Sequence, residues 1–184
     1  LPDAGDHLVT EIAGLPIVVI RDTAGRLRAY HNVCRHRAGP LALCNGKGAK
    51  ALRCKYHGWT YTLDGVLRSA PEMGDTKDFD MASIRLPELR LDTWQGLVFV
   101  AGDDAPAFAD FTRGFDGPLR SLSPKDYVFH QRFSYDVACN WKVYVDNYLE
   151  GYHVPHVHPG LNRLLDYRSY RTELEQWHSL QWSP

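Results

Sequence analysis

The sequence lacks the features that would indicate a secreted, membrane or nucleic-acid-binding protein. Its 184 residues include only four cysteines, too few for a disulfide scaffold. The formal net charge is -1, with 21 Lys and Arg against 22 Asp and Glu, which gives no electrostatic case for nucleic acid or an anionic membrane. The longest apolar stretch near the start, Leu15–Ile20, is far shorter than a membrane span or a signal-peptide core. We therefore expect a cytoplasmic protein that acts on a small molecule.

The pattern of the chain changes about two thirds of the way along. The earlier part consists of short segments rich in β-branched and aromatic residues, separated by Gly, Pro and Asp, which predicts an all-β domain of antiparallel strands. Asp64 and Gly65 lie between two apolar runs and are predicted to form a hairpin turn. Residues 101–126 are rich in Asp, Ala, Gly and Pro, which indicates a connection between domains.

A helix is predicted after this connection. Five apolar side chains fall at helical spacing: Trp141, Tyr144, Val145, Tyr148 and Tyr152. Asn140 can cap the N-terminus of the helix, which should run from about Trp141 to Tyr152. Pro155 should then disturb it, because proline lacks the backbone donor that a helix needs.

The strongest signal is two pairs of cysteine and histidine. Cys34 and His36 form the first pair, and 17 residues later Cys54 and His57 form the second. Two hairpin loops could present these four side chains around a small inorganic centre. Zinc also accepts two thiolates and two imidazoles, but zinc fingers typically present them in the order Cys, Cys, His, His. The order Cys, His, Cys, His instead suits a two-iron cluster, with one iron held by both thiolates and the other by both imidazoles.

These residues resemble a known motif. The stretches CRH (residues 34–36) and CKYHGW (residues 54–59) are similar to the Rieske [2Fe-2S] motif of Rieske non-haem iron oxygenases. RLDTWQGLVFV (residues 90–100) resembles the strand that closes that domain. The resemblance implies that a Rieske cluster is held by four residues: Cys34, His36, Cys54 and His57. We expect the other two cysteines, Cys44 and Cys139, to be small buried apolar residues.

The same resemblance implies a fold and its domains. The expected fold class is α+β, with an all-β Rieske [2Fe-2S] domain in residues 1–115. The N-terminal part of a helix-grip catalytic domain, which combines an antiparallel sheet with helices, would occupy residues 116–184. This second domain would hold a mononuclear non-haem Fe(II).

A second group of metal-ligand side chains lies in EGYHVPHVH, residues 150–158. In a regular helix His153 and His156 would share a face, but Pro155 weakens that argument, so spacing alone leaves the metal-binding pair open. The resemblance implies that His153 and His158 hold the iron and that His156 is spare. It also implies that Glu150 bridges one of these histidines and a Rieske histidine of a neighbouring subunit, which requires a ring of subunits, expected to be a homotrimer.

The third iron ligand is not evident in the sequence. The resemblance implies an Asp or Glu far downstream, on a helix of the C-terminal domain. Asp166, Glu173 and Glu175 lie too close after His158 to match it, so none is assigned as a ligand. We expect these residues to be an incomplete version of a longer protein.

The stretch NWKVYVDNYLEGYHVPHVHPGL (residues 140–161) most resembles the branch that includes choline monooxygenase and carnitine or betaine oxygenases. The resemblance implies hydroxylation of a quaternary ammonium compound with O2, using electrons from a flavin-containing NAD(P)H reductase, directly or through a ferredoxin. Tyr144, Tyr148 and Tyr152 could hold the cation through their ring faces, although tyrosines at helical spacing are more often part of a core. One alternative is hydroxylation of an aromatic ring. Another is a Rieske electron-transfer protein without a mononuclear iron.

Overall fold

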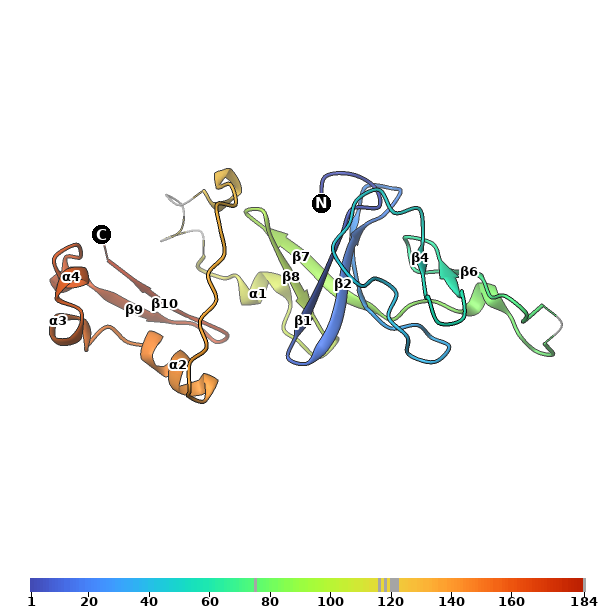
Figure 1. The fold of residues 1–184 in the computed structure, drawn as a ribbon. Helices are drawn as coiled ribbons and strands as arrows, with labels where there is room; N and C mark the ends of the chain where they lie inside the picture. The colour runs from blue at the N-terminus through green and yellow to red at the C-terminus, as the bar shows by residue number, and fades with distance from the viewer. Residues whose placement is uncertain (75, 116, 118, 120–122, 184) are drawn as a thin grey trace. The chain divides into compact units, whose positions relative to one another are not determined.

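The computed structural model describes residues 1–74, 76–115, 117, 119 and 123–183 (Figure 1). The chain divides into two compact units. Unit 1 is Leu1–Trp94 with Val98–Ala105, and unit 2 is Gln95–Leu97 with Pro106–Pro184. The domain boundary expected between residues 115 and 116 falls on a position, residue 116, that lies outside the described residues.

The larger of the two sheets in unit 1 has five strands. Its strand order is β1-β2-β3-β7-β8, and the strands are β1 (His7–Ile12), β2 (Leu15–Arg21), β3 (Leu27–His31), β7 (Glu88–Trp94) and β8 (Leu97–Ala101). The pairs β1–β2, β2–β3 and β3–β7 are antiparallel. Ala13 and Gly14 connect β1 to β2, and both have positive φ, 51° and 79°, as a two-residue hairpin of type I′ requires.

A three-stranded antiparallel sheet carries the second Cys–His pair. It contains β4 (Leu52–Arg53), β5 (Thr60–Tyr61) and β6 (Leu67–Ser69), in the order β4-β5-β6, followed by a 3-10 turn, η1 (Met81–Ser83). The predicted hairpin turn at Asp64–Gly65 is confirmed. The amide of Gly65 donates to Thr62 O at 3.0 Å, and Gly65 has a φ of 87°, which glycine adopts without strain.

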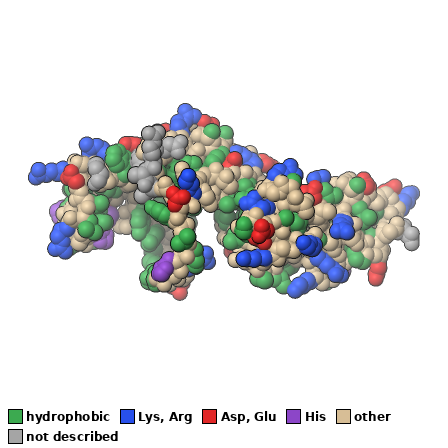
Figure 2. Space-filling view, turned by 90° about the horizontal axis from the view of Figure 1, so that it is seen from above, with side chains coloured by type: hydrophobic (Ala, Val, Ile, Leu, Met, Phe, Trp, Pro, Cys, Tyr) green, Lys and Arg blue, Asp and Glu red, His purple; other side chains and the backbone are tan. Residues whose placement is uncertain are grey.

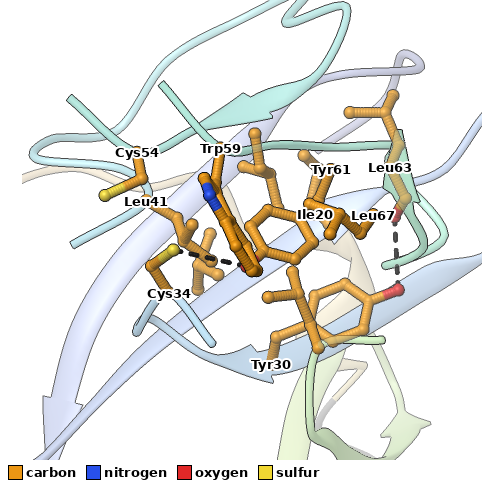
Figure 3. Close-up of a cluster of buried hydrophobic side chains, with 12 residues drawn as sticks. Ile20, Tyr30, Cys34, Leu41, Cys54, Trp59, Tyr61, Leu63 and Leu67 are labelled. Carbon is orange, nitrogen blue, oxygen red and sulfur yellow. Dashed lines mark hydrogen bonds between the residues drawn. The ribbon is translucent and has the colours of Figure 1, made fainter. Parts of the chain in front are cut away.

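The core of unit 1 contains both cysteines of the Cys–His pairs. Twelve buried side chains form it: Val18, Ile20, Tyr30, Cys34, Leu41, Leu52, Cys54, Trp59, Tyr61, Leu63, Leu67 and Leu86. Figure 3 shows Cys34 and Cys54 together at one side of this cluster, next to Leu41 and Trp59. Burial of a side chain of leucine size stabilises a fold by about 1.5–3 kcal/mol, so the same packing that stabilises unit 1 also fixes the positions of the two thiols.

A buried carboxylate organises the turn between β2 and β3. Asp22 is 1% exposed, and it accepts hydrogen bonds from Arg28 Nε at 2.8 Å, Arg26 Nε at 3.1 Å and the Arg26 amide at 2.9 Å. Burial by itself would raise the pKa of Asp22, but the hydrogen bonds from Arg28 and Arg26 outweigh it and lower the pKa to about 2. The charged form of this carboxylate therefore stabilises the folded chain.

Unit 2 consists of short elements. They are α1 (Phe108–Phe111), η2 (Pro124–Asp126), α2 (Trp141–Tyr148), α3 (Val154–Val157), α4 (Pro159–Asn162), η3 (Tyr167–Ser169), β9 (Arg171–Leu174) and β10 (Ser179–Trp182). The strands β9 and β10 form an antiparallel pair. An all-β first part followed by a part with helices and an antiparallel pair is the α+β architecture that the sequence predicts, and that prediction is confirmed.

The predicted helix is right at its start and wrong at its end. α2 begins at Trp141, where Asn140 Oδ1 accepts from the Lys142 amide at 2.9 Å as expected of an N-cap. It ends at Tyr148 and not at Tyr152. The Glu150 carboxylate accepts from the backbone amides of Tyr152 and His153, which replaces helical hydrogen bonding with a turn.

Much of unit 2 is exposed in the described residues. Every residue from 125 to 150 is exposed, and α2 contains no buried residue. Hydrophobic side chains are correspondingly visible on the surface drawn in Figure 2. The expectation that Cys44 and Cys139 are buried is wrong, because both lie in exposed segments that no described element covers.

Among the described residues, no helix has the length and apolar character needed to cross a membrane.

Candidate functional site

The first Cys–His pair lies on a tight loop, Cys34–Gly39, which follows β3. The Cys34 amide donates to Gly39 O at 2.8 Å, and the Ala38 amide donates to Cys34 O at 3.0 Å. Ala38 has a φ of 55°, a left-handed conformation that costs a residue with a Cβ roughly 1–2 kcal/mol. The loop is thus closed by two hydrogen bonds, with His36 near its tip.

The second pair lies on a loop with the same hydrogen-bond pattern, Cys54–Trp59, which joins β4 to β5. The Cys54 amide donates to Trp59 O at 2.9 Å, and the Gly58 amide donates to Cys54 O at 3.0 Å. Gly58 takes the left-handed position, with a φ of 75°. Two loops that differ in sequence therefore present their side chains from one backbone geometry, which is a fold built to hold two matched pairs.

The two cysteines and the two histidines differ in their exposure to solvent. Cys34 and Cys54 are 4% and 2% exposed, whereas both histidines are exposed. The rings of His36 and His57 lie with their centroids 4.5 Å apart, at an angle of 65°. Two buried thiols and two adjacent, exposed imidazoles match the donor set of a [2Fe-2S] centre held by two cysteines and two histidines.

Aromatic rings support both histidines. His36 stacks on Trp59 at a centroid distance of 4.9 Å and an interplanar angle of 10°, and His57 lies 3.8 Å from the ring of Tyr56. The loss of hydration at the His57 ring, with the nearby charges of His36 and Arg37, lowers the pKa of His57. A lower pKa favours the neutral imidazole, which is the form that binds metals.

Two further residues contact the thiols, and neither was predicted from the sequence. The hydroxyl of Tyr61 lies 3.3 Å from Cys34 Sγ and accepts a hydrogen bond from the Arg35 amide at 3.1 Å. Gly39 approaches the other thiol, since a Cβ on Gly39 would lie 2.9 Å from Cys54 Sγ. Neither contact could be read from spacing, because each joins segments that only the fold brings together.

The second candidate site is built on the turn between α2 and α3. The ring of His153 contacts the ring of His158 with their centroids 5.2 Å apart, at 75°. His156 is exposed on α3. The structure therefore brings His153 and His158 together, and the regular helix that would have favoured His153 with His156 is absent, since α2 ends before these residues.

Glu150 is closely engaged with His153. The Nδ1 nitrogen of His153 donates to Glu150 Oε1, and this hydrogen bond is the main reason that the pKa of Glu150 is lowered. Oε2 accepts from the amides of Tyr152 and His153. With Nδ1 held by a carboxylate, Nε2 of His153 is left for a metal, as in many metal-binding histidines. A carboxylate has about four acceptor positions, so Glu150 Oε1 retains one for a further donor.

The ring of Tyr170 packs against the turn that carries Glu150 and His153. A Cβ on Gly151 would lie 2.5 Å from Tyr170 Cζ, so a glycine is needed where the turn before His153 passes that ring. Gln181 on β10 donates to Leu149 O at 3.4 Å, at the end of α2. The hairpin β9–β10 and the residue before it therefore hold the turn that carries Glu150 and His153.

An open cavity of about 740 Å³ lies beside the second site. It is lined by Asn147, Tyr148, Glu150, His153, Val154, Val157, His158, Pro159, Gly160, Leu161, Leu165, Tyr170 and Gln181. Of the three tyrosines proposed from the sequence to hold a cation, Tyr148 lines this cavity, while Tyr144 and Tyr152 are not among its lining residues.

Two of the three nearby carboxylates that were not assigned as ligands have other partners. Asp166 accepts from the Ser169 hydroxyl at 2.6 Å, and Glu173 accepts from the indole of Trp182 at 3.1 Å. Across the described residues, no three His, Cys, Asp or Glu side chains converge closely enough to hold one metal ion. The first site is compatible with that finding, because a Rieske cluster takes two protein ligands on each iron.

Family models match both parts of the chain. Residues 1–83 match the Rieske [2Fe-2S] domain, and residues 124–182 match the catalytic domain of the ring-hydroxylating alpha subunit. Each match covers one candidate site. The catalytic domain of that family uses a mononuclear iron.

Relatives and solved structures agree with these models. The chain is 33% identical to the chloroplastic choline monooxygenase of Arabidopsis thaliana, in a match that covers 98% of this chain and 46% of that protein. It is 34% identical to the carnitine monooxygenase oxygenase subunit of Escherichia coli K12, with coverage of 98% and 47%. A quaternary ammonium Rieske monooxygenase solved with L-carnitine superposes with a TM-score of 0.84 at 33% identity, covering 98% of this chain and 52% of that one. The chain thus spans about half the length of the curated relatives it matches.

Proposed function

Since the chain belongs to the family of Rieske oxygenase alpha subunits, we propose that it forms part of a monooxygenase that hydroxylates a quaternary ammonium compound. The observation that carries this proposal is the combination of two matched Cys–His loops with a His153–His158 pair whose first ring is held by Glu150. An electron carrier needs only the loops. A further iron would need its own ligands, and the His153–His158 pair, with Glu150 bound to Nδ1 of His153, can provide two of them.

In this proposal the residues of unit 1 hold the cluster and set its surroundings. Cys34 and Cys54 supply thiolates from the core, and His36 and His57 supply neutral imidazoles at the surface. When bound, a Rieske cluster supplies single electrons and the mononuclear iron supplies O2 activation. The protein contributes the positions of the ligands, which the closed loops hold before any metal arrives.

In unit 2, His153 and His158 would hold the mononuclear iron, together with a carboxylate that we do not assign to any described residue. Glu150 orients His153 through Nδ1. Its remaining acceptor position on Oε1 is available to the N–H of a Rieske histidine of a neighbouring subunit, which would make Glu150 the bridge between the two metal centres. This role implies a closed ring of subunits, and we retain the homotrimer as a proposal.

The substrate class rests on the relatives and on the cavity. Choline and carnitine, on which the two relatives act by name, both carry a quaternary nitrogen. The ring of Tyr148 lines the cavity beside His153 and His158, and Tyr170 lines it as well. Aromatic faces attract such cations by roughly 0.5–2 kcal/mol each. Hydroxylation of an aromatic ring is the alternative, favoured by the description of the catalytic family model.

We retain three further proposals from the sequence. The Rieske domain is assigned to residues 1–115 and the catalytic part to residues 116–184. Electrons come from a flavin-containing NAD(P)H reductase, directly or through a ferredoxin. The cytoplasmic location stays a prediction that cell fractionation would check.

The proposed function is tested by measuring iron and acid-labile sulfide per chain on protein purified without oxygen, with an electron paramagnetic resonance spectrum after dithionite. Three irons for two sulfides and a Rieske signal would support both sites, and Cys34→Ser should abolish the signal. Two irons for two sulfides in wild type would mean that the site at His153 and His158 is empty, as expected of an electron carrier or of a fragment of an oxygenase. Incubation with choline, carnitine, glycine betaine and an aromatic substrate then separates the substrate classes by product analysis.

A further inference from the structure

The charge around the two cluster loops differs from that of the rest of the chain. Residues 23–63 contain eight Lys and Arg side chains and no Asp or Glu, although the whole chain has a net charge of -1. Both cluster loops lie within this range. The bases nearest to the histidines in sequence, Arg35, Arg37 and Lys55, are exposed. Exposed bases therefore flank both histidines along the chain.

One pocket in unit 1 combines this charge with an aromatic ring. It has a volume of about 440 Å³ and is lined by Arg35, Trp59, Ser83, Ile84 and Arg85. Arg85 comes from the segment after η1, and its only acidic partner among the described residues is Asp64, at 3.8 Å. We call this the Arg35–Arg85 pocket.

Trp59 connects the pocket to the cluster ligands. Trp59 is 5% exposed and its ring stacks on that of His36 at 4.9 Å, and the same residue lines the pocket together with the two arginines. An electron that arrives at the pocket would therefore reach a cluster ligand through one stacked ring. His57 has a different neighbour, Tyr56, over which Arg37 lies at 5.6 Å.

We propose that the Arg35–Arg85 pocket is the docking point for the acidic surface of the electron donor, and that electrons reach the cluster on the His36 side. One electron leaves the reduced [2Fe-2S] centre of a ferredoxin, which is oxidised, and the cluster is reduced; no bond forms or breaks. This assignment rests on the proposed function, since the cluster must be reduced by a partner. It leaves His57 for the neighbouring subunit that Glu150 would bridge.

The positive charge of the pocket favours an acidic protein surface as its partner. Two guanidinium groups attract carboxylates, and opposite charges on two proteins speed their encounter by tenfold or more at low ionic strength. The Debye length is about 10 Å at 0.1 M salt, so the attraction should fade at high salt. Trp59 also offers electrons a short path from this pocket to His36. A basic patch with only a structural role would not need such a path.

The test compares Arg85→Glu with Lys50→Glu. Lys50 is exposed and belongs to the same acid-free stretch, but it precedes β4, whereas the cluster loop follows that strand. Both substitutions change the net charge by the same amount. The probe is a plant-type [2Fe-2S] ferredoxin, which is acidic. Its binding to the cluster-loaded chain is measured by calorimetry at low and high salt, and cluster reduction is followed by stopped-flow absorbance.

We expect Arg85→Glu to weaken binding and slow reduction by about tenfold at low salt, and Lys50→Glu to change either by less than about twofold. High salt should remove the difference, and Arg85→Lys should restore wild-type behaviour. The reduced methyl viologen cation should reduce the Arg85→Glu cluster at least as fast as the wild-type cluster. Arg35→Gln provides a second variant if Arg85→Glu does not fold, with the cluster signal as the check.

Equal effects of Arg85→Glu and Lys50→Glu would overturn the proposal, as would a defect that persists at high salt. A change in sedimentation of Arg85→Glu with unchanged ferredoxin binding would place the pocket between subunits and also overturn it. Failure of the proposed function would look different. Wild-type protein would then bind ferredoxin and be reduced, but it would hold no mononuclear iron and form no hydroxylated product. That result would leave the docking assignment intact.

Discussion

The hydroxyl of Tyr61 should raise the reduction potential of the cluster. It lies 3.3 Å from Cys34 Sγ within the core, where Tyr61 is 0% exposed, so water cannot replace it. The Arg35 amide donates to the same oxygen, which leaves the Tyr61 hydrogen to point at the sulfur. A hydrogen bond to a ligand sulfur stabilises the reduced cluster more than the oxidised one, because reduction adds negative charge.

The size of the effect follows from the strength of such a bond. A hydrogen bond to a charged group contributes about 1.5–3 kcal/mol, and we assume that about half of this distinguishes the two oxidation states. For a one-electron couple about 1.4 kcal/mol corresponds to roughly 59 mV. Tyr61→Phe should therefore lower the potential by roughly 30–60 mV, measured by a redox titration followed by electron paramagnetic resonance.

Tyr30→Phe is the matched control. Tyr30 is also buried in the same core, at 1% exposure, but its hydroxyl donates to Leu63 O at 3.3 Å and contacts no ligand. Loss of this hydroxyl should reduce stability and leave the potential unchanged. An unchanged potential in Tyr61→Phe, or an equal shift in both variants, would refute the assignment of the effect to the Cys34 contact.

Three other substitutions test the remaining arguments. Glu150→Gln should leave both metals bound and slow single-turnover reduction of the mononuclear iron; an unchanged rate would contradict the bridge. Gly151→Ala, whose Cβ would lie 2.5 Å from Tyr170, should lower iron affinity at the second site about tenfold or more and spare the cluster signal, as metal analysis will show. Asp22 has a pKa of about 2 in the folded chain against 3.8 for an ordinary carboxyl, so its contribution of about 2 kcal/mol is complete above pH about 4 and is lost as the pH falls towards 2. Urea unfolding of Asp22→Asn should therefore differ from wild type at pH 6 and converge with it near pH 2; a constant difference would count against this linkage.

The features that the sequence predicted are those encoded within a few residues. Asn140 caps α2 by accepting a hydrogen bond from an amide two residues further on. The turn at Gly65 needs only a φ of 87°, which glycine adopts without strain. The spacing of Cys34 with His36, and of Cys54 with His57, could be recognised because each pair lies on one loop. Local chemistry of this kind is visible in a linear pattern.

The missed features depend on contacts between distant segments. Tyr61 reaches Cys34 across 27 positions of the chain, and no spacing rule relates them. The end of α2 at Tyr148 was missed because apolar spacing continues to Tyr152, whereas the Glu150 carboxylate competes for the amides that would extend the helix.

The two predictions for the remaining cysteines failed for a related reason. Free cysteine is usually buried, so composition alone favoured burial of Cys44 and Cys139, yet both are exposed. The same statistical argument would have been right for Cys34 and Cys54, which the core encloses. Burial is decided by which segments pack together: the packing around the cluster loops encloses Cys34 and Cys54, whereas Cys44 and Cys139 stay exposed. The buried thiols are thus those with a proposed role in metal binding, because the core that fixes the loops also excludes water from the sulfurs.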